Sequence, residues 1–215
     1  VGRDRPAALF LAGDIGQRIF RLPFSWAKLG LDVRGRSHSL KVNYRTSHQI
    51  RAMADRLLPP SIADLDGVEE GRRGTVSIFD GPVPQVHLAD GTDSEVEHVT
   101  AWLQACVAAA IPPGEIGVLV RSSDELCRAR RAVENAELGS ENSGEPVVAV
   151  MHDAKGLEFR AVAVIACDED VLPDPRRLAA IGDVAEMESV YETERHLLYV
   201  ACTRARDWLL VSGVA

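Results

Sequence analysis

Several features that would place the chain in a special class of protein are scarce or missing. Its 215 residues include only four cysteines and 5% aromatic residues. The cysteines stand far apart, with no C-x-x-C pair and no histidine cluster beside them, so a zinc site or a disulfide framework is not expected and the thiols should be reduced. No apolar run approaches the ~20 residues of a membrane span, and the first residues do not resemble a signal peptide. We therefore expect a cytoplasmic protein without a membrane partner.

The chain also lacks the groups with which many proteins hold a nucleotide. It contains no G-x-x-x-x-G-K-[ST] loop and no acidic strand end of the kind that holds Mg²⁺. No cluster of histidines and carboxylates has the spacing of metal ligands, so no metal site is expected, and a nuclease is only a distant alternative. The net charge of −8 argues weakly against a free-standing nucleic-acid-binding protein, because such proteins usually present a basic surface.

The composition is that of an ordinary globular protein, with 46% apolar and 26% charged residues. Short continuous apolar runs, typical of strands covered on both faces, alternate with helical patterns. This alternation predicts an α/β fold of doubly wound type with a mostly parallel sheet. The predicted strands are Ala8–Ala12, Ser39–Val42, Thr75–Phe79 or Gln85–Leu88, Ile116–Val120, Val147–Met151, Ala161–Ala166 and Trp208–Ser212. The predicted helices are Ser47–Leu58, Ser94–Ala110, Ser122–Glu137 and Ala185–Ala205, and loops are expected at Pro59–Gly74 and Leu138–Pro146.

The last predicted helix carries an arginine on its apolar face. Arg204 stands seven residues after Leu197 and three after Ala201, so it continues a stripe with helical spacing. The other members of this stripe are Met187, Val190, Tyr191 and Leu198. A buried arginine must find an anion, because burying an unpaired charge is costly. A structural ion pair and a functional contact with a phosphate both remain open on this pattern alone.

Two further polar segments follow predicted strands, at the ends where ligands bind in open α/β sheets. Gly13 and Asp14 form a turn after the first strand, and Gln17 could aim its amide at a phosphate oxygen or a water. Arg45 directly precedes a predicted helix, where an anion would also meet free backbone amides. Its guanidinium suits a phosphate, although an arginine on an exposed turn is an equally ordinary explanation.

The segment from His152 to Phe159 lies between two predicted strands and is too short for more than about one helical turn. Gly156, after Lys155, permits close approach of a ligand to the backbone. Glu158 could accept a hydrogen bond from a sugar hydroxyl. The plainer alternatives are a satisfied loop imidazole at His152 and a solvated charge at Lys155.

Four motifs occur in one order along the chain. They are Gly13-Asp14-x-x-Gln17-Arg18-Ile19-Phe20, Leu40-x-x-Asn43-Tyr44-Arg45-Thr46, His152-x-Ala154-Lys155-Gly156-Leu157-Glu158-Phe159 and Tyr199-Val200-Ala201-x-Thr203-Arg204-Ala205-Arg206. Together they closely resemble motifs III, IV, V and VI of superfamily 1 helicases of the UvrD/Rep type.

The resemblance implies a RecA-like, P-loop NTPase-type three-layer α/β sandwich and an ATP-dependent DNA helicase or translocase, with 3′→5′ polarity favoured. Residues 1–37 would be the C-terminal remnant of the first RecA-like motor domain, and residues 38–215 would be the second. ATP and Mg²⁺ would be the cofactors, with the Mg²⁺ ligands in the missing N-terminal domain, which would also be the partner in cis. Single-stranded or partly duplex DNA would be the substrate.

The resemblance also implies roles for individual residues. Gln17 would sense the γ-phosphate, and Arg45 and Arg204 would reach it as arginine fingers. The remaining residues expected to bind ATP are Gly13, Asp14, Gly156 and Glu158. The residues expected to face DNA are Tyr44, His152 and Lys155.

The chain departs from the family pattern in three respects. Val150 stands where the family often has threonine, and His196 replaces a frequent arginine. Too few residues separate Arg45 from His152 for the large mobile subdomain that UvrD and Rep insert before motif V. Because the phosphate loop is missing, we expect this chain to be inactive alone. A catalytically silent helicase-like module for DNA or protein interaction is the alternative.

Overall fold

The computed structural model describes residues 17, 19, 25–31, 38–63, 69–71, 74–138 and 144–215. The predicted strand Ala8–Ala12 and the predicted site residues Gly13 and Asp14 lie outside these described residues. Within them, no helix combines the length and the apolar character that crossing a bilayer requires.

A five-stranded parallel sheet forms the centre of the domain. Its strands are β5 (Gln85–Ala89), β6 (Ile116–Val120), β7 (Val147–Val150), β8 (Phe159–Val164) and β9 (Ala205–Val214). They lie in the order β5-β9-β8-β6-β7, and every neighbouring pair is parallel. The predicted α/β class with a parallel sheet is thus confirmed.

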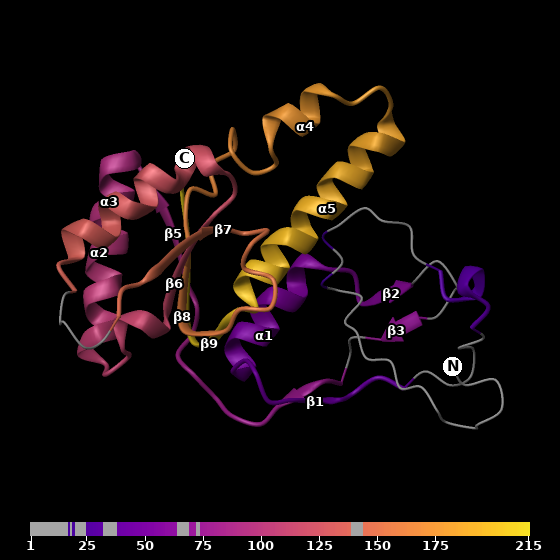
Figure 1. The fold of residues 1–215 in the computed structure, drawn as a ribbon, viewed down its shortest axis with the longest axis horizontal. Helices are drawn as coiled ribbons and strands as arrows, with labels where there is room; N and C mark the ends of the chain where they lie inside the picture. Colours follow the sequence, from indigo (N-terminus) through magenta and orange to yellow (C-terminus); the bar gives the residue numbers. More distant parts are fainter. Residues whose placement is uncertain are drawn as a thin grey trace.

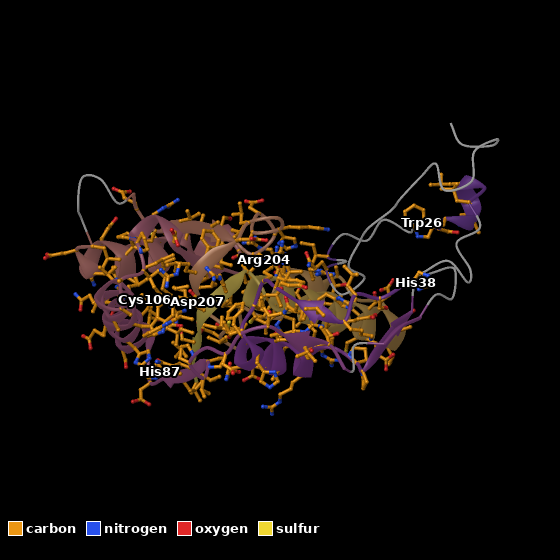
Figure 2. All side chains as sticks on the ribbon, turned by 90° about the horizontal axis from the view of Figure 1, so that it is seen from below. Trp26, His38, His87, Cys106, Arg204 and Asp207 are labelled. Carbon is orange, nitrogen blue, oxygen red and sulfur yellow. The ribbon has the colours of Figure 1, made fainter. Side chains whose placement is uncertain are left out.

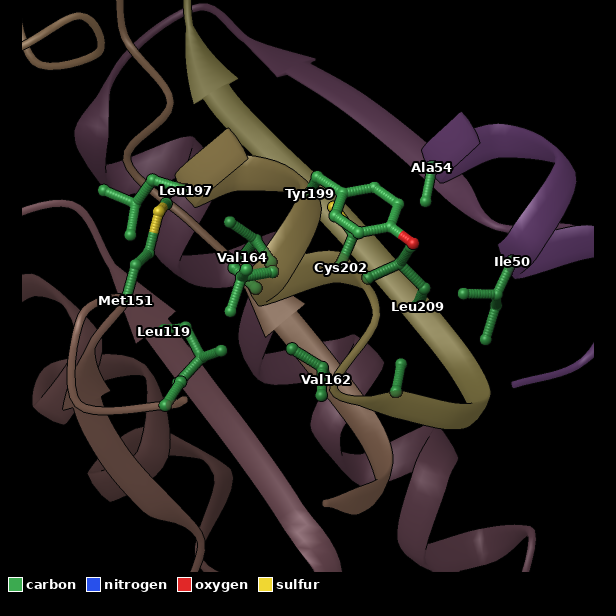
Figure 3. Close-up of a cluster of buried hydrophobic side chains, with 14 of the residues drawn as sticks. Ile50, Ala54, Leu119, Met151, Val162, Val164, Leu197, Tyr199, Cys202 and Leu209 are labelled. Atoms are coloured by element: carbon green, nitrogen blue, oxygen red, sulfur yellow. The ribbon is translucent and has the colours of Figure 1, made fainter. Parts of the chain in front are cut away.

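Helices cover both faces of this sheet and make three layers (Figure 1). One face carries α1 (His48–Ala54) and α5 (Val184–Cys202), and the other carries α2 (Thr92–Ala108) and α3 (Leu126–Ala136). Side chains of β8 alternate between the layers, as a strand buried on both faces requires. Val162 and Val164 pack in the cluster with α1 and α5, part of which Figure 3 shows, whereas Ala161 and Ala163 pack with α2 and α3.

Smaller elements surround the three layers. The parallel pair β1 (Val42–Asn43) and β4 (Val76–Ser77) lies beside α1, and β2 (Ser61–Ala63) pairs antiparallel with β3 (Glu69–Gly71). Neither the β2–β3 pair, which falls in a predicted loop, nor α4 (Pro175–Ala179) is anticipated from the sequence. Four 3₁₀ turns complete the described elements: Ala27–Leu29, Asp55–Leu57, Pro113–Glu115 and Ser123–Glu125.

The predicted apolar stripe of the last helix is only partly buried. Val190, Leu197 and Ala201 belong to the core, but Met187 and Tyr191 are 41% and 39% exposed. The cause is geometric, because the first half of α5 projects beyond the five-stranded sheet (Figure 1). For these two residues the predicted burial was wrong.

Two connections cross the α1–α5 face between opposite edges of the sheet. We call the edge where the parallel strands begin the amino edge, and the edge where they end the carboxyl edge. Residues 151–158 lead from the end of β7 to the start of β8, and Met151 and Ala154 are buried in the cluster with α5. Helix α5 likewise leads to the start of β9. Glu158 and Arg204 therefore lie at the amino edge, not at the carboxyl edge where ligands of open α/β sheets usually bind.

Candidate functional site

A fixed turn presents the side chain of Arg45 at the start of α1. The Asn43 side chain accepts a hydrogen bond from the Arg45 backbone N–H at 2.9 Å and donates one to the Thr46 hydroxyl at 2.5 Å. Ser47 then caps the helix by accepting from the Ile50 N–H at 3.4 Å, as its N-cap position predicts. Such side-chain turns hold a backbone in place without restraining the next side chain. The Arg45 guanidinium is 39% exposed and forms an ion pair with Glu158.

Arg204 is buried inside the domain, just beyond the end of α5 (Figure 2). Its Nε donates to the carbonyl oxygen of Val200 at 3.0 Å, and its Nη1 donates to that of Leu157 at 3.3 Å. Its Nη2 lies 3.4 Å from the Thr203 hydroxyl. A cation at this position is favoured by the negative end of the helix dipole. The expected burial of Arg204 is confirmed, and these contacts fix the direction of its guanidinium.

The two arginines meet at consecutive residues of one loop. Arg204 contacts Leu157, Arg45 contacts Glu158, and the Phe159 N–H donates to the Arg204 carbonyl oxygen at 3.0 Å. Gly156 precedes this pair with φ +92°, a left-handed conformation that favours glycine, and a Cβ there would meet nothing within 4 Å. The backbone at Gly156 thus borders open space immediately before the two residues that the arginines contact.

A second polar cluster lies at the carboxyl edge. Glu194 of α5 accepts from Arg121 Nε at 2.5 Å and Nη2 at 2.8 Å, and from Arg177 Nη1 at 2.6 Å. Asp174 adds an ion pair with Arg121 at 3.5 Å. Arg121 directly follows β6, so this cluster joins the end of the sheet to α4 and α5. The sequence could have predicted that Glu194 is buried, because it lies four residues after Val190 and three before Leu197, on the apolar side of the helix.

His152 lies beside this second cluster. Its pKa is lowered by burial and by the positive charge of Arg121, so the imidazole is mostly neutral near pH 7. Tyr44, by contrast, neighbours Arg45 at the amino edge and is 70% exposed. Lys155 is exposed in the loop between the two edges. The three residues predicted to face DNA therefore do not form one cluster.

Ile19, two residues after Gln17, packs in the α1–α5 cluster, so the Gln17 backbone lies on this side of the sheet. Among the described residues, no group of three histidine, cysteine or carboxylate side chains could hold a metal ion. An open groove of about 330 Å³ runs along α1 past His48 and Arg51, but none of the predicted site residues within the described ranges lines it.

Comparison with known proteins relates the C-terminal part of the chain to one family. Residues 125–215 match a family model described as the UvrD-like helicase C-terminal domain. The chain is 40% identical to ATP-dependent DNA helicase UvrD1 of Mycobacterium leprae (strain TN) over 76 residues, which are 35% of this chain and 9% of the relative. It is 34% identical to UvrD1 of Mycobacterium tuberculosis (strain ATCC 25618 / H37Rv) over 110 residues, 49% of this chain and 13% of the relative. The chain thus spans only about a tenth of the length of these relatives.

A solved structure shares the fold. It is the C-terminal domain of a "possible DNA helicase" from Lactobacillus (strain WCFS1), with a TM-score of 0.50 and 20% identity over 80% of this chain and 88% of that one.

The sheet and its two helical layers define a parallel α/β domain in which Arg45 and Arg204 meet at the amino edge. Residues 125–215 of this domain belong to the UvrD-like helicase C-terminal domain family, of the UvrD type within superfamily 1.

Proposed function

We propose that the chain supplies the second RecA-like motor domain of an ATP-dependent DNA helicase or translocase with 3′→5′ polarity. Residues 38–215 form this domain in the proposal, and residues 1–37 form the end of the first motor domain. The observation that carries the proposal is the meeting of Arg45 and Arg204 at Leu157 and Glu158. Two arginines from distant parts of the chain that converge at one edge suit a polyphosphate bound against that edge.

In this proposal the two arginines contribute differently to ATP hydrolysis. Arg204 is held rigidly by carbonyl oxygens, so its charge is already oriented when the phosphate arrives, and such preorganisation is the main source of electrostatic catalysis. Arg45 is exposed and can change partner. Gln17 senses the γ-phosphate, Gly156 allows close approach, and Glu158 receives a sugar hydroxyl. Mg²⁺, bound mainly by another domain, would neutralise phosphate charge.

The proposed DNA contacts divide between the two edges. Tyr44 offers an exposed ring on which a base could stack, and Lys155 offers a charge for a phosphate. Because the lowered pKa of His152 keeps its ring neutral, we assign His152 a hydrogen bond to DNA, not an ionic contact. Its place beside Arg121 and Glu194 would connect the DNA to helix α5.

Steady-state ATP hydrolysis by the full-length protein tests the finger assignment. Arg45→Ala and Arg204→Lys should each lower kcat by a large factor, since related arginine fingers contribute about 10³–10⁵. The lysine variant keeps the charge of Arg204 but loses the planar fork. Arg206→Ala is the matched control, because Arg206 is exposed and packs over the Phe79 ring, 5.5 Å from its centroid.

Circular dichroism would establish that each variant is folded. Unchanged kcat in both finger variants would contradict the motor assignment of the arginines. A full-length protein that binds DNA without hydrolysing ATP would instead support the silent interaction module, the function that the net charge of −8 also allows. If residues 1–215 alone hydrolyse ATP, the expectation that the phosphate loop and the Mg²⁺ ligands lie in another domain is wrong.

A further inference from the structure

The ion pair between Arg45 and Glu158 joins two groups that the proposed function assigns to different parts of one nucleotide. Arg45 is assigned to the terminal phosphate and Glu158 to a sugar hydroxyl. In the structure they bind each other instead. The carboxylate therefore fills the position in which the guanidinium would receive a phosphate.

Both side chains stand on fixed backbone. The Asn43 side chain holds the turn beneath Arg45 by accepting from its N–H at 2.9 Å. Arg204 holds the backbone on both sides of Glu158, through the Leu157 carbonyl oxygen at 3.3 Å and the Phe159 N–H at 3.0 Å. The side chains of Arg45 and Glu158 are nevertheless 39% and 58% exposed. They can exchange partners by rotamer changes alone, without movement of the loop or of α1.

The free energy needed to separate Arg45 from Glu158 depends on which new partner each group gains. Exposed ion pairs contribute little, so breaking this one should weaken a competing ligand by at most about fivefold. A free polyphosphate satisfies Arg45 but leaves Glu158 beside new negative charge with only water as partner. A nucleotide satisfies both groups, because its phosphate takes the guanidinium and its sugar hydroxyl donates to the carboxylate.

We propose that Glu158 is a specificity-determining residue that makes the release of Arg45 depend on the sugar of the nucleotide. Its carboxylate competes for Arg45 with every anion that approaches. A ligand with sugar hydroxyls offsets this competition, because a hydroxyl donates to the carboxylate once Arg45 has left it. The site thereby selects a nucleoside triphosphate over an inorganic polyphosphate. This inference rests on the proposed function and adds to it the exchange of partners at Arg45.

Calorimetric titration of the full-length protein with ATP, 2′,3′-dideoxy-ATP and tripolyphosphate tests this exchange. In Glu158→Ala, tripolyphosphate should bind more tightly than to the wild type, by up to about fivefold, because its competitor is gone. Dideoxy-ATP should also bind more tightly, whereas ATP should not, since it loses the hydroxyl contact. Asp124→Ala is the matched control, because it removes a carboxylate from another exposed arginine pair, Arg176–Asp124, and should change none of the three affinities.

A second background separates this inference from the proposed function. In Arg45→Ala, the additional change Glu158→Ala should tighten tripolyphosphate less than it does in the wild-type background, because no guanidinium is left to release and only the repulsion by the carboxylate is removed. Equal tightening in both backgrounds would show that Glu158 only repels anions, and no tightening in either would show that it does not compete; both results overturn the exchange. If Arg45→Ala alone leaves the affinities for ATP and tripolyphosphate unchanged, the phosphate contact of Arg45 itself is wrong, whatever Glu158 does.

Discussion

The buried cluster at the carboxyl edge predicts that Glu194→Ala strongly lowers the stability of the domain. Glu194 is 3% exposed and accepts two hydrogen bonds from Arg121, whose side chain is 6% exposed. Removing one partner of a buried ion pair leaves an uncompensated charge and costs about 3–5 kcal/mol. Asp174, 3.5 Å from Arg121, stays in place and offsets part of this charge. We therefore expect the free energy of unfolding to fall by about 3 kcal/mol.

Urea unfolding followed by tryptophan fluorescence measures this loss. With a slope of about 2 kcal/mol per M for a domain of this size, the midpoint should fall by roughly 1.5 M. The double variant Arg121→Met/Glu194→Leu should recover only part of it: apolar residues of similar volume replace a buried pair at little cost, but Arg177 also loses its contact with Glu194 and Asp174 its contact with Arg121. Asp124→Ala, which breaks the exposed Arg176–Asp124 pair, should cost less than about 1 kcal/mol. An equally small loss for Glu194→Ala would refute the view that this cluster anchors α5.

Two further predictions concern packing and pH. In Gly117→Ala, the added Cβ would lie 2.8 Å from the Phe159 ring, so the variant should lose about 1–3 kcal/mol in the same urea assay, and an unchanged midpoint would contradict this tight contact. His98 stacks on His87 with ring centroids 3.7 Å apart, and burial together with His87 lowers the pKa of His98 below 6.5. The unfolded chain therefore binds more protons as the pH falls through 6.5, and stability should decline from there toward lower pH. In His98→Phe this decline should be shallower, and an identical pH profile would show that the stacked pair does not contribute to it.

Local patterns in the sequence predict the sheet well where turn residues bound an apolar run. The strand predicted at Ile116–Val120 agrees with β6, because Pro113 and Gly114 end the preceding segment and the polar Arg121 follows. The strand predicted at Ala161–Ala166 is shifted by two residues, and β8 covers Phe159–Val164. The apolar run continues past the ladder, since Ile165 and Ala166 are also buried. Hydrophobicity reports burial, whereas pairing with β9 decides where the strand begins.

The candidate site shows the same division between local and long-range information. Motif spacing marks Arg45, Glu158 and Arg204 as candidate site residues, but it cannot show that the first two pair with each other. Arg121 and Glu194 are 73 positions apart, so no local sequence pattern can identify them as partners. The sequence also places Glu158 and Arg204 after helical or loop segments without revealing that both connections return to the amino edge. Topology supplies that fact, because every strand of the sheet is parallel.

Helix α5 connects the cluster at the carboxyl edge with the arginine at the amino edge. Glu194 and Arg204 are ten residues apart, which corresponds to roughly 15 Å along a helix. If α5 is held as one rigid unit, loosening it at Glu194 must also loosen the hydrogen bond between the Phe159 N–H and the Arg204 carbonyl oxygen. We therefore expect the Phe159 amide hydrogen to exchange faster in Glu194→Ala than in the wild type, by more than amides of α2 on the opposite face. Unchanged protection of Phe159 would mean that β8 and β9 hold Arg204 independently of the cluster at the other edge.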